Sequence, residues 1–447
     1  MSLTKKFEKI FKSLLPAPFT IAVLLTFLTF FLAFFFTKSE ANNHLLEIFS
    51  FWEQGVWNPK LLVFTVQMML MLVLGHVLAL SDSVNSVINY AVKRCDNTSK
   101  AAAIVTFFTI LVSLFNWGLG LIFGAIFAKK VGELASVNNI KINYPLVGAC
   151  GYSGLMVWHG GISGSAPIKV AESGHFLSEQ IGVISQSETI FSTMNISVSI
   201  LLLLVLPTLM YIIGKKESGK KIVLPSKIKK EKEISIIGAE KLDNSKFLAW
   251  MFGGAILIYA SYKAIIMPEN ITLKVITPNY INLLLLAFGI IMHKTFINFL
   301  KAIDNAIIGS SGILIQFPLY FGIMGIINQS GLTLLMSNFF INISNEITFP
   351  IFTFLSAGIV NIFVPSGGGQ WAIQGPIIVE AATQLGVSIP KSIMALAYGD
   401  QLTNMLQPFW ALPLLGITGL KAKEILPYTL ILFIAGFSIF IFGLLFF

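Results

Sequence analysis

The sequence predicts an all-α integral membrane protein built from two inverted repeats, each with a re-entrant helical hairpin. Hydrophobic residues make up 55% of the 447 residues and charged residues 11%, against roughly 25% charged in soluble domains, and the mean hydropathy is +0.81. Apolar runs approaching the ~20 residues of a membrane-spanning helix recur along the chain, for example at 19–36 and 200–213. A helical bundle follows, because only helices and closed barrels satisfy their backbone in lipid.

Basic residues around the first apolar runs set the predicted orientation. Four lysines between residues 5 and 12 precede the run at 19–36, and no small-residue cleavage site follows it. We therefore expect a retained first helix with a cytoplasmic N-terminus. A second span at 60–80 returns the chain to the cytoplasm, where the basic segment 93–100 follows. The positive-inside rule thus explains the net charge of +9, and nucleic-acid binding is not expected.

The apolar stretch 101–128 has basic residues at both ends. A single span would place one of these ends outside, so the charges favour a hairpin of two half-helices that enter and leave on the cytoplasmic side. The Asn-Trp-Gly sequence at 116–118 is the expected turn. A helix from about residue 144 leaves the cytoplasm and the run ending near 213 returns, which completes a first repeat at 1–213.

A lysine-rich segment at 214–246 separates the two halves, with eight lysines between residues 215 and 232. Such a charge run is usually a solvated face, so we interpret it as a cytoplasmic linker that needs no partner. The second half, 247–447, contains a connecting helix followed by the second repeat.

The spans expected in the second half are 247–265, 277–293, 308–328, 391–415 and 426–447. The segment 329–348 has no Lys or Arg and is expected outside, whereas Lys421 and Lys423 are expected in the cytoplasm. The C-terminus is then external, and the expected location is a bacterial inner membrane. The stretch 349–380 contains Pro-Ser-Gly-Gly-Gly at 365–369, which predicts a second re-entrant hairpin that enters from the external side.

The two halves align without a gap at an offset of 248 residues, which pairs Gly151 with Gly399 and the turn 116–118 with 364–366. An odd number of crossings separates equivalent elements, because hairpins contribute none, so the repeats are inverted. Inverted repeats with interrupted helices are typical of secondary transporters, whose substrate site lies at the midplane where half-helix ends meet. The sequence therefore predicts a transporter rather than an enzyme.

The segment 361–376, NIFVPSGGGQWAIQGP, is the first predicted substrate site. Pro365 ends one half-helix, and three glycines leave backbone amides unshielded at the start of the next, where the helix dipole carries about half a positive charge. A small carboxylate is the expected ligand. The residues assigned to it are Ser366, Gly367, Gly368, Gly369 and Gln370, with Trp371 as an apolar wall. The alternative is that the glycines only allow close helix packing.

The opposing turn supplies Asn116, Trp117 and Gly118 as further substrate-binding candidates. Asn116 is a neutral hydrogen-bonding group and Trp117 a second apolar wall. An Asn-Gly kink on its own is often only a kink, so this assignment depends on the repeat relation.

Polar residues in the otherwise apolar span after Ala397 form the predicted coupling site. Asp400, Thr403 and Asn404 are assigned to ion coupling, and Gln407 on the same helical face to substrate. A carboxylate at the bilayer centre costs at least about 2.5 kcal/mol, so Asp400 is a functional candidate. It would hold Na⁺ together with oxygens near Asn404, or accept H⁺. The alternative is an Asp400 solvated at the external end.

His159 occupies the position in the first half that the offset of 248 pairs with Gln407. A histidine can carry protons near neutral pH, so His159 joins the ion-coupling candidates. The alternative is a structural histidine with satisfied hydrogen bonds. Ser163 and Ser165 follow in an unwound Gly-rich segment, and no cofactor other than H⁺ or Na⁺ is expected.

Three long motifs resemble the bacterial short-chain fatty acid transporter family: FNWGLGLIFGA at 115–125, FVPSGGGQWAIQGP at 363–376 and GDQLTNMLQPFWALPLLGI at 399–417. The resemblance covers almost the whole chain. It implies uptake of small monocarboxylates such as acetoacetate or butyrate, and membership of the wider ion transporter superfamily. It also implies a homodimer in which a scaffold domain supports a moving transport domain, an elevator arrangement.

The chain departs from the related dicarboxylate symporters, which carry Ser-Asn-Thr turns at both hairpin tips. Here the tips read Asn-Trp-Gly at 116–118 and Ser-Gly-Gly at 366–368, so sodium sites are not carried over. Fewer hydroxyl groups and two tryptophans suit a substrate with one carboxylate and a short aliphatic tail. A single methylene changes binding in such a pocket by only about 1–3 kcal/mol, so sharp chain-length selectivity is not expected.

Two rival functions are compatible with parts of the sequence. A cation/proton antiporter would use Asp400 as its ion site and the glycine tip as structure. An intramembrane serine protease would use Ser163 in a Gly-x-Ser-Gly turn, but the histidines after it, His175 and His293, are expected in loops. The two cysteines, at 95 and 150, show neither metal-ligand spacing nor a disulfide framework.

Overall fold

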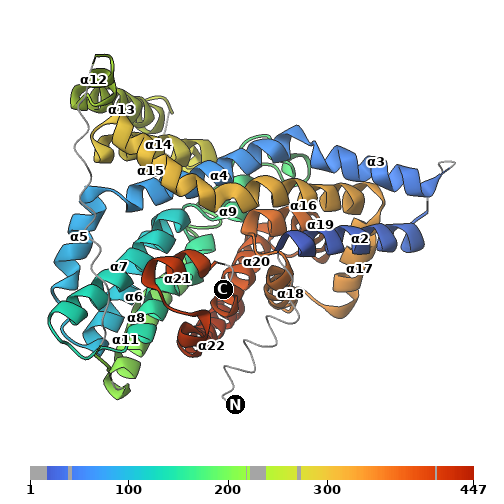
Figure 1. The fold of residues 1–447 in the computed structure, drawn as a ribbon. Coiled ribbons are helices and arrows are strands. Elements are labelled where there is room, and N and C mark those ends of the chain that lie inside the picture. Colours follow the sequence, from blue (N-terminus) through green and yellow to red (C-terminus); the bar gives the residue numbers. More distant parts are fainter. Residues whose placement is uncertain (1–17, 39–42, 218, 222–237, 269–272, 408–409) are drawn as a thin grey trace.

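The computed structural model describes residues 18–38, 43–217, 219–221, 238–268, 273–407 and 410–447, and its regular elements there are helices (Figure 1). An isolated antiparallel bridge joins Ile142 to Lys220. The α-helices of the first half are α2 (Pro18–Phe36), α3 (His44–Val56), α4 (Pro59–Ala79), α5 (Asp82–Val92), α6 (Thr98–Phe115), α7 (Trp117–Val137), α8 (Tyr144–Tyr152), α9 (Ser165–Val170), α10 (Ser178–Ile181) and α11 (Thr193–Lys216). Those of the second half are α12 (Glu240–Asp243), α13 (Lys246–Ser261), α14 (Pro278–His293), α15 (Phe296–Ile307), α16 (Ser311–Gln329), α17 (Leu332–Ile343), α18 (Phe349–Phe363), α19 (Gly367–Leu385), α20 (Ile389–Thr403), α21 (Leu412–Thr418) and α22 (Ala422–Phe446).

Local sequence explains where several of these helices begin. Helices α4, α8, α14 and α20 each start with a polar cap and a proline in the first turn. The cap side chain accepts a hydrogen bond from a backbone amide that the helix itself leaves unpaired, and proline suits the first turn because its missing N–H is not needed there. The caps are Asn58, Asn143, Thr277 and Ser388.

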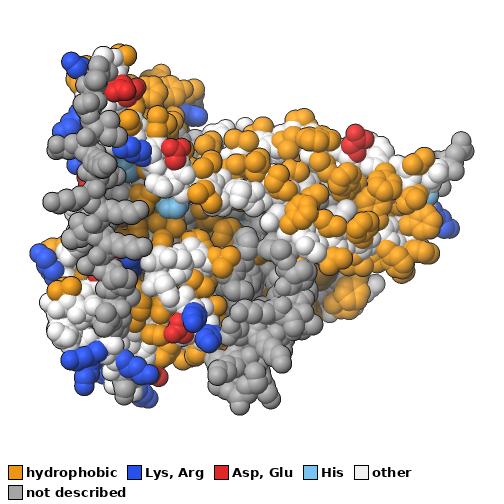
Figure 2. Space-filling view, in the orientation of Figure 1, with side chains coloured by type: hydrophobic (Ala, Val, Ile, Leu, Met, Phe, Trp, Pro, Cys, Tyr) orange, Lys and Arg blue, Asp and Glu red, His pale blue; other side chains and the backbone are white. Residues whose placement is uncertain are grey.

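The surface of the protein suits lipid. In the described residues, seven helices are long and apolar enough to cross a membrane, among them α2, α4, α11 and α22. Large apolar side chains such as Phe27 and Phe247 are about two-thirds exposed or more. Figure 2 shows hydrophobic side chains covering the part of this face formed by α2, α3 and α16, with Lys and Arg gathered at the opposite edge. The chain is a multi-pass membrane protein.

Two helical hairpins occur where the sequence is interrupted. Helix α6 ends at Asn116, and α7 begins at the next residue, because the extended backbone of Asn116 ends one helix while its side chain caps the other. In the second half, Val364, Pro365 and Ser366 separate α18 from α19, and Ser366 caps α19 in the same way. The first hairpin runs to Val137, nine residues beyond the expected end at 128, since the helix continues through Lys129 and Lys130.

An interrupted helix follows each hairpin. Helix α8 passes into 3-10 turns at Ser153–Met156 and Trp158–Gly160 before α9 begins. Helix α20 passes into a 3-10 turn at Asn404–Leu406 before α21. The gaps between the pieces carry backbone groups that no regular helix satisfies, so side chains from other segments must supply their partners.

Helix bounds in the two halves correspond at the offset of 248. Adding 248 to the bounds of α6 gives 346–363, beside α18 at 349–363, and adding it to α7 gives 365–385, beside α19 at 367–385. The same shift moves α9 to 413–418, beside α21 at 412–418. The helices around the two hairpins therefore follow the same order in both halves at this offset.

Figure 1 shows α4 and α3 following one another along one edge of the molecule, and α16 packs against both of them and against α2. Helix α4 packs on α7 and α16 packs on α19, so the second arm of each hairpin contacts this layer. Two predicted features lie wholly or partly outside the described residues: the N-terminal lysines, and residues 218 and 222–237 of the linker.

Candidate functional site

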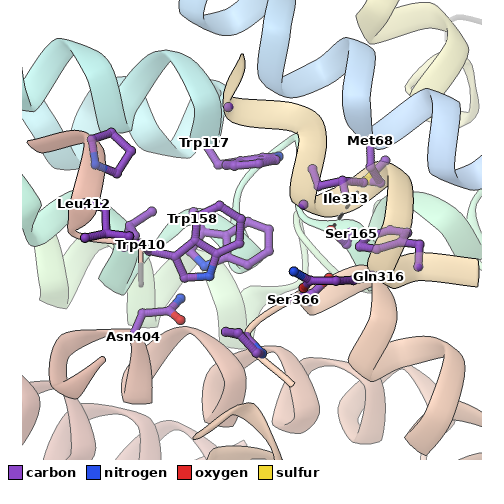
Figure 3. Close-up of a pocket in the computed structure, with 18 of the residues that line it drawn as sticks. Met68, Trp117, Trp158, Ser165, Ile313, Gln316, Ser366, Asn404, Trp410 and Leu412 are labelled. Carbon is purple, nitrogen blue, oxygen red and sulfur yellow. Dashed lines mark hydrogen bonds between the residues drawn. The ribbon is translucent and has the colours of Figure 1, made fainter. Parts of the chain in front are cut away.

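A cavity of about 260 Å³ lies where the two hairpin turns meet the interrupted helices (Figure 3). Trp117 of the first turn and Pro365, Ser366, Gly367 and Gly368 of the second all line it. Its volume falls below the ~300–1,000 Å³ typical of pockets for drug-sized ligands, so it suits a small molecule. The other lining residues are Met68, Leu155, Trp158, Ser165, Gly309, Ser311, Gly312, Ile313, Gln316, Phe317, Asn404, Trp410, Leu412 and Pro413.

The repeat relation runs through this cavity. Three pairs of lining residues differ by 248 in number: Met68 and Gln316, Trp117 and Pro365, Ser165 and Pro413. Equivalent positions of two repeats meet only near the axis that relates them. In transporters with inverted repeats, the substrate site lies where equivalent positions of the repeats meet.

The start of α19 presents backbone donors to the cavity. Ser366 Oγ accepts a hydrogen bond from the amide of Gly369 at 3.2 Å, and the Ser366 carbonyl accepts one from the amide of Gln370 at 2.7 Å. A helix supplies no acceptor for the amides of its first turn. The amides of Gly367 and Gly368 are therefore the donors left for a ligand, at the positive end of the helix dipole.

The glycines also pack closely against neighbouring rings. A Cβ atom at Gly367 would lie 2.6 Å from the Trp158 ring and 2.7 Å from the His159 ring. A Cβ atom at Gly369 would lie 2.5 Å from the Tyr320 ring. The glycines can be interpreted either as a carboxylate site or as a means of close helix packing. Both interpretations are compatible here, because a residue without a side chain allows close packing and also leaves its backbone amide uncovered.

Aromatic rings form one side of the cavity. The Trp117 ring centroid lies 5.7 Å from that of Trp158 and 5.5 Å from that of Trp410. Figure 3 shows these rings together on one side, with Ser366, Gln316 and Ser165 on the other. A ligand in this cavity would meet the tryptophan rings and Asn404 on one side, and hydroxyl and amide groups together with Met68 and Ile313 on the other.

Three residues assigned to the second turn lie away from the cavity lining. Gly369 packs against Tyr320, as described above. The side-chain amide of Gln370 donates from Nε2 to the backbone carbonyl of Ala357 at 2.8 Å, and this bond joins the two arms of the hairpin. Trp371 lies one helical turn after Gly367 in α19. Its side chain is fully buried, and its ring packs against Phe176.

We expect Gln370→Ala to lower the stability of the hairpin rather than substrate affinity. The change removes a buried hydrogen bond between α18 and α19, which corresponds to about 1–3 kcal/mol of unfolding free energy. Thermal unfolding of the purified variant and its half-saturation constant for uptake are the two measurements. A large rise in half-saturation with unchanged unfolding would instead place Gln370 at the substrate.

Only Trp117 of the first turn lines the cavity. Asn116 is fully buried, its Oδ1 accepting from the amide of Leu119 at 2.7 Å. Gly118 packs against the backbone of Leu72, where a Cβ atom would approach within 2.9 Å. Ser163 Oγ accepts from the amide of Trp117 at 2.9 Å, so the serine of the protease alternative serves as a cap for this turn.

The polar residues of α20 gather around a residue that the sequence analysis did not assign. The side-chain nitrogen of Asn361, Nδ2, lies 2.7 Å from the backbone carbonyl oxygen of Asp400, 2.9 Å from Thr403 Oγ1 and 3.0 Å from Asn404 Oδ1. Gln407 donates to the Asn361 carbonyl at 2.6 Å. The four candidates lie in α20 (Asp400, Thr403), in the 3-10 turn after it (Asn404) and at the end of that turn (Gln407), and among them Asn404 lines the cavity. Asn361 lies one turn before Pro365. A polar residue in this otherwise apolar arm of the hairpin is the sequence feature that could have identified it as a candidate site residue.

His159 and Asp400 form a buried pair between the two interrupted helices. His159 Nδ1 lies 2.6 Å from Asp400 Oδ2, and both side chains are at most 1% exposed. The amide of Ala166 donates to His159 Nε2 at 3.0 Å. A backbone amide can only donate, so Nε2 carries no proton and Nδ1–H donates to the Asp400 carboxylate. Asp400 is thus enclosed rather than solvated at a helix end.

The same segments are joined by two further contacts. Gln401 Oε1 accepts from the amides of His159 at 2.9 Å and Gly160 at 3.1 Å, which satisfies backbone groups left by the interrupted helix. The Tyr152 hydroxyl donates to the Asn404 carbonyl at 2.9 Å. The interrupted helices of the two halves therefore hold each other in one unit.

The model of the short chain fatty acid transporter family matches residues 1–447, the whole chain. The chain belongs to this family. A candidate short-chain fatty acid transporter of Escherichia coli K12 is 37% identical over 436 residues, covering 96% of each protein. One of Haemophilus influenzae is 37% identical over 447 residues, covering 97% of this chain and 96% of that protein. The protein is a transporter and not an enzyme, as the sequence predicted.

Two solved transporters share the fold. The YdaH transporter of Alcanivorax borkumensis gives a TM-score of 0.61 at 14% identity, covering 96% of this chain and 98% of that one. MtrF of Neisseria gonorrhoeae, described as one of a class of antimetabolite efflux pumps, gives 0.60 at 13% identity, covering 98% and 97%. At these identities the likeness concerns the fold alone.

Proposed function

We propose that the protein is a secondary active transporter of short-chain monocarboxylates such as butyrate or acetoacetate. The cavity at the two hairpin turns carries the proposal. Its polar side offers the amides of Gly367 and Gly368 at a helix start to a carboxylate. Its aromatic side, Trp117, Trp158 and Trp410, suits a short aliphatic tail.

Alternating access follows from the inverted repeats in this proposal. The layer of α2, α3, α4 and α16 would serve as the scaffold. The hairpins, together with the interrupted helices joined by His159 and Asp400, would move as the transport domain. Exchanging the conformations of the two repeats would expose the cavity to each side in turn. A homodimer of such scaffolds in a bacterial inner membrane completes the proposal.

We assign energy coupling to H⁺ at the Asp400 and His159 pair. The pair keeps a carboxylate in a buried place, where protonation removes its charge and so lowers the cost of moving it across the membrane. Coupling to Na⁺ near Asp400 and Asn404 is the alternative. Uptake driven by a pH gradient and by a sodium gradient, each imposed alone on reconstituted vesicles, decides between them.

Counterflow tests the transport activity itself. Purified protein in vesicles loaded with unlabelled butyrate should accumulate external labelled butyrate without any cation gradient, and protein-free vesicles correct for neutral acid that crosses lipid unaided. Exchange of cations without any carboxylate movement would support the cation/proton antiporter instead.

Ser366→Ala should raise the half-saturation constant for carboxylate uptake about 3- to 10-fold. Loss of a helix cap costs about 1 kcal/mol and loosens the turn that orients the two free amides. Ser438→Ala is the control, because its hydroxyl bonds within its own exposed helix at Ile434. Equal half-saturation constants in Ser366→Ala and the control would count against this site.

A further inference from the structure

A buried lysine next to the cavity has no role in the function proposed so far. Lys169 is 3% exposed and belongs to α9, one helical turn after Ser165, which lines the cavity. A charged side chain within apolar helices is costly and marks a functional site by default. What surrounds the ammonium group decides which function is open to it.

Lys169 contacts the carboxylate of Glu172 and two side chains of α4. Its Nζ donates to Glu172 Oε2, and to Gln67 Oε1 of α4 at 3.2 Å. It also lies 5.2 Å from the centre of the Phe64 ring. Gln67 Nε2 donates in turn to Glu172 Oε1 at 2.7 Å, so an amide bridges the ion pair.

This network lies between the cavity and the protein surface. Ser165 Oγ contacts the Met68 sulfur at 3.5 Å on the cavity side, and the Phe64 ring reaches within 3.0 Å of where a Cβ atom at Gly368 would lie. On the other side, the Glu172 side chain is 16% exposed. Glu172 is the second residue of the segment 171–192, which has no Lys or Arg, and the positive-inside rule therefore places this segment outside.

The ion pair occurs in one repeat only. The offset of 248 pairs Lys169 with Ile417 and Glu172 with Leu420, so the second repeat has apolar residues at these places. An element needed by the architecture of both repeats would be present in both. The pair therefore distinguishes one route to the cavity from the other.

We propose that Lys169 is an entry site for carboxylates on the external route, where Glu172 occupies the place of the substrate until it arrives. An incoming carboxylate would replace Glu172 at the ammonium group, so one anion is exchanged for another and Lys169 is never left unpaired. The substrate would then pass to the amides of Gly367 and Gly368. With no substrate, opening this route would separate a buried ion pair, which is strongly unfavourable and keeps the route closed. This inference rests on the proposed transport of monocarboxylates.

The test compares half-saturation constants for butyrate from the two sides of oriented vesicles, after wild-type counterflow has established transport. Lys169→Gln should raise the external constant at least tenfold and leave the internal one within about twofold. Lys60→Gln is the matched control, because Lys60 is an exposed lysine 4.0 Å from Glu179 of the same external segment. Equal changes on both sides would overturn the inference, while absent wild-type counterflow would instead refute the proposed function.

Two more variants separate an entry site from a purely structural ion pair. Glu172→Gln should lower the external half-saturation constant, because the ammonium group loses its resident competitor. An unchanged or higher constant would contradict the inference, and this readout holds even if Lys169→Gln does not fold. The double variant Lys169→Glu with Glu172→Lys keeps an ion pair but places the cation at position 172. It should therefore be thermally more stable than Lys169→Gln and still lack butyrate uptake from the external side. Restored external uptake would show a structural role only.

Discussion

Asp400→Asn should abolish accumulation of carboxylate against a gradient while leaving part of the exchange activity. The asparagine keeps the shape of the side chain and an oxygen that accepts from His159 Nδ1. It cannot bind and release a proton, so the step that couples transport to the pH gradient is lost. We expect concentrative uptake to fall at least a hundredfold, to the level of protein-free vesicles, as a loss of about 2.7 kcal/mol or more in driving force would require.

The measurements are concentrative uptake under an imposed pH gradient and counterflow without one, on the same reconstituted sample. Asp82→Asn is the control, since Asp82 is a surface carboxylate paired with Lys294 and its side chain is 79% exposed. Accumulation by Asp400→Asn equal to that of the control would remove Asp400 from the coupling role. Accumulation driven by sodium alone in the wild type would assign coupling to the other ion.

The hairpins could be predicted because their signals are local. Proline, glycine and a capping serine or asparagine impose helix ends close to their own positions. In the structure α6 ends next to Asn116, and α18 ends at Phe363, two residues before Pro365. Hydropathy likewise located apolar helices such as α2, α4, α11 and α22, because the length of an apolar helix depends on neighbouring residues. The expected span 391–415 is instead divided between α20 and α21. The repeat offset followed from the order of such signals.

Local sequence signals could not predict which of the candidate residues line the cavity or which of them contact one another. Whether Gln370 and Trp371 face the cavity depends on which neighbours cover α19, and the sequence around them does not say. Asp400 and His159 were both candidates, but they are 241 residues apart and nothing local pairs them. The partners of the Asn361 side chain lie 39 to 43 residues away, and Lys169 contacts Gln67, 102 residues away, as well as the nearby Glu172.

The contact of Asp400 with His159 has a counterpart at the positions that the offset of 248 relates to them, Tyr152 and Gln407. The Tyr152 hydroxyl donates to the Gln407 carbonyl at 3.4 Å as well as to the Asn404 carbonyl at 2.9 Å. Each interrupted helix thus satisfies the other's unpaired groups. In the proposed proton coupling, a change of charge at Asp400 would therefore act on both interrupted helices.

Gly367→Ala should disrupt transport more than any other single-methyl change near the cavity. The new Cβ atom would lie 2.6 Å from the Trp158 ring and 2.7 Å from the His159 ring. His159 is fixed by Asp400 on one side and by the Ala166 amide on the other, so its ring cannot move away without losing one of them. Overpacking of this kind costs about 1–3 kcal/mol, and we expect both uptake and counterflow to fall at least tenfold.

Gly254→Ala is the matched control, because a Cβ atom there has no neighbour within 4 Å and alanine favours the helix. Uptake, counterflow and thermal unfolding should be measured for both variants in the same detergent and lipid. Gly367→Ala should unfold at a lower temperature, whereas Gly254→Ala should match or exceed the wild type. Normal counterflow in Gly367→Ala would mean that the start of α19 neither touches the substrate nor depends on the position of His159, and the proposed binding site would have to lie elsewhere.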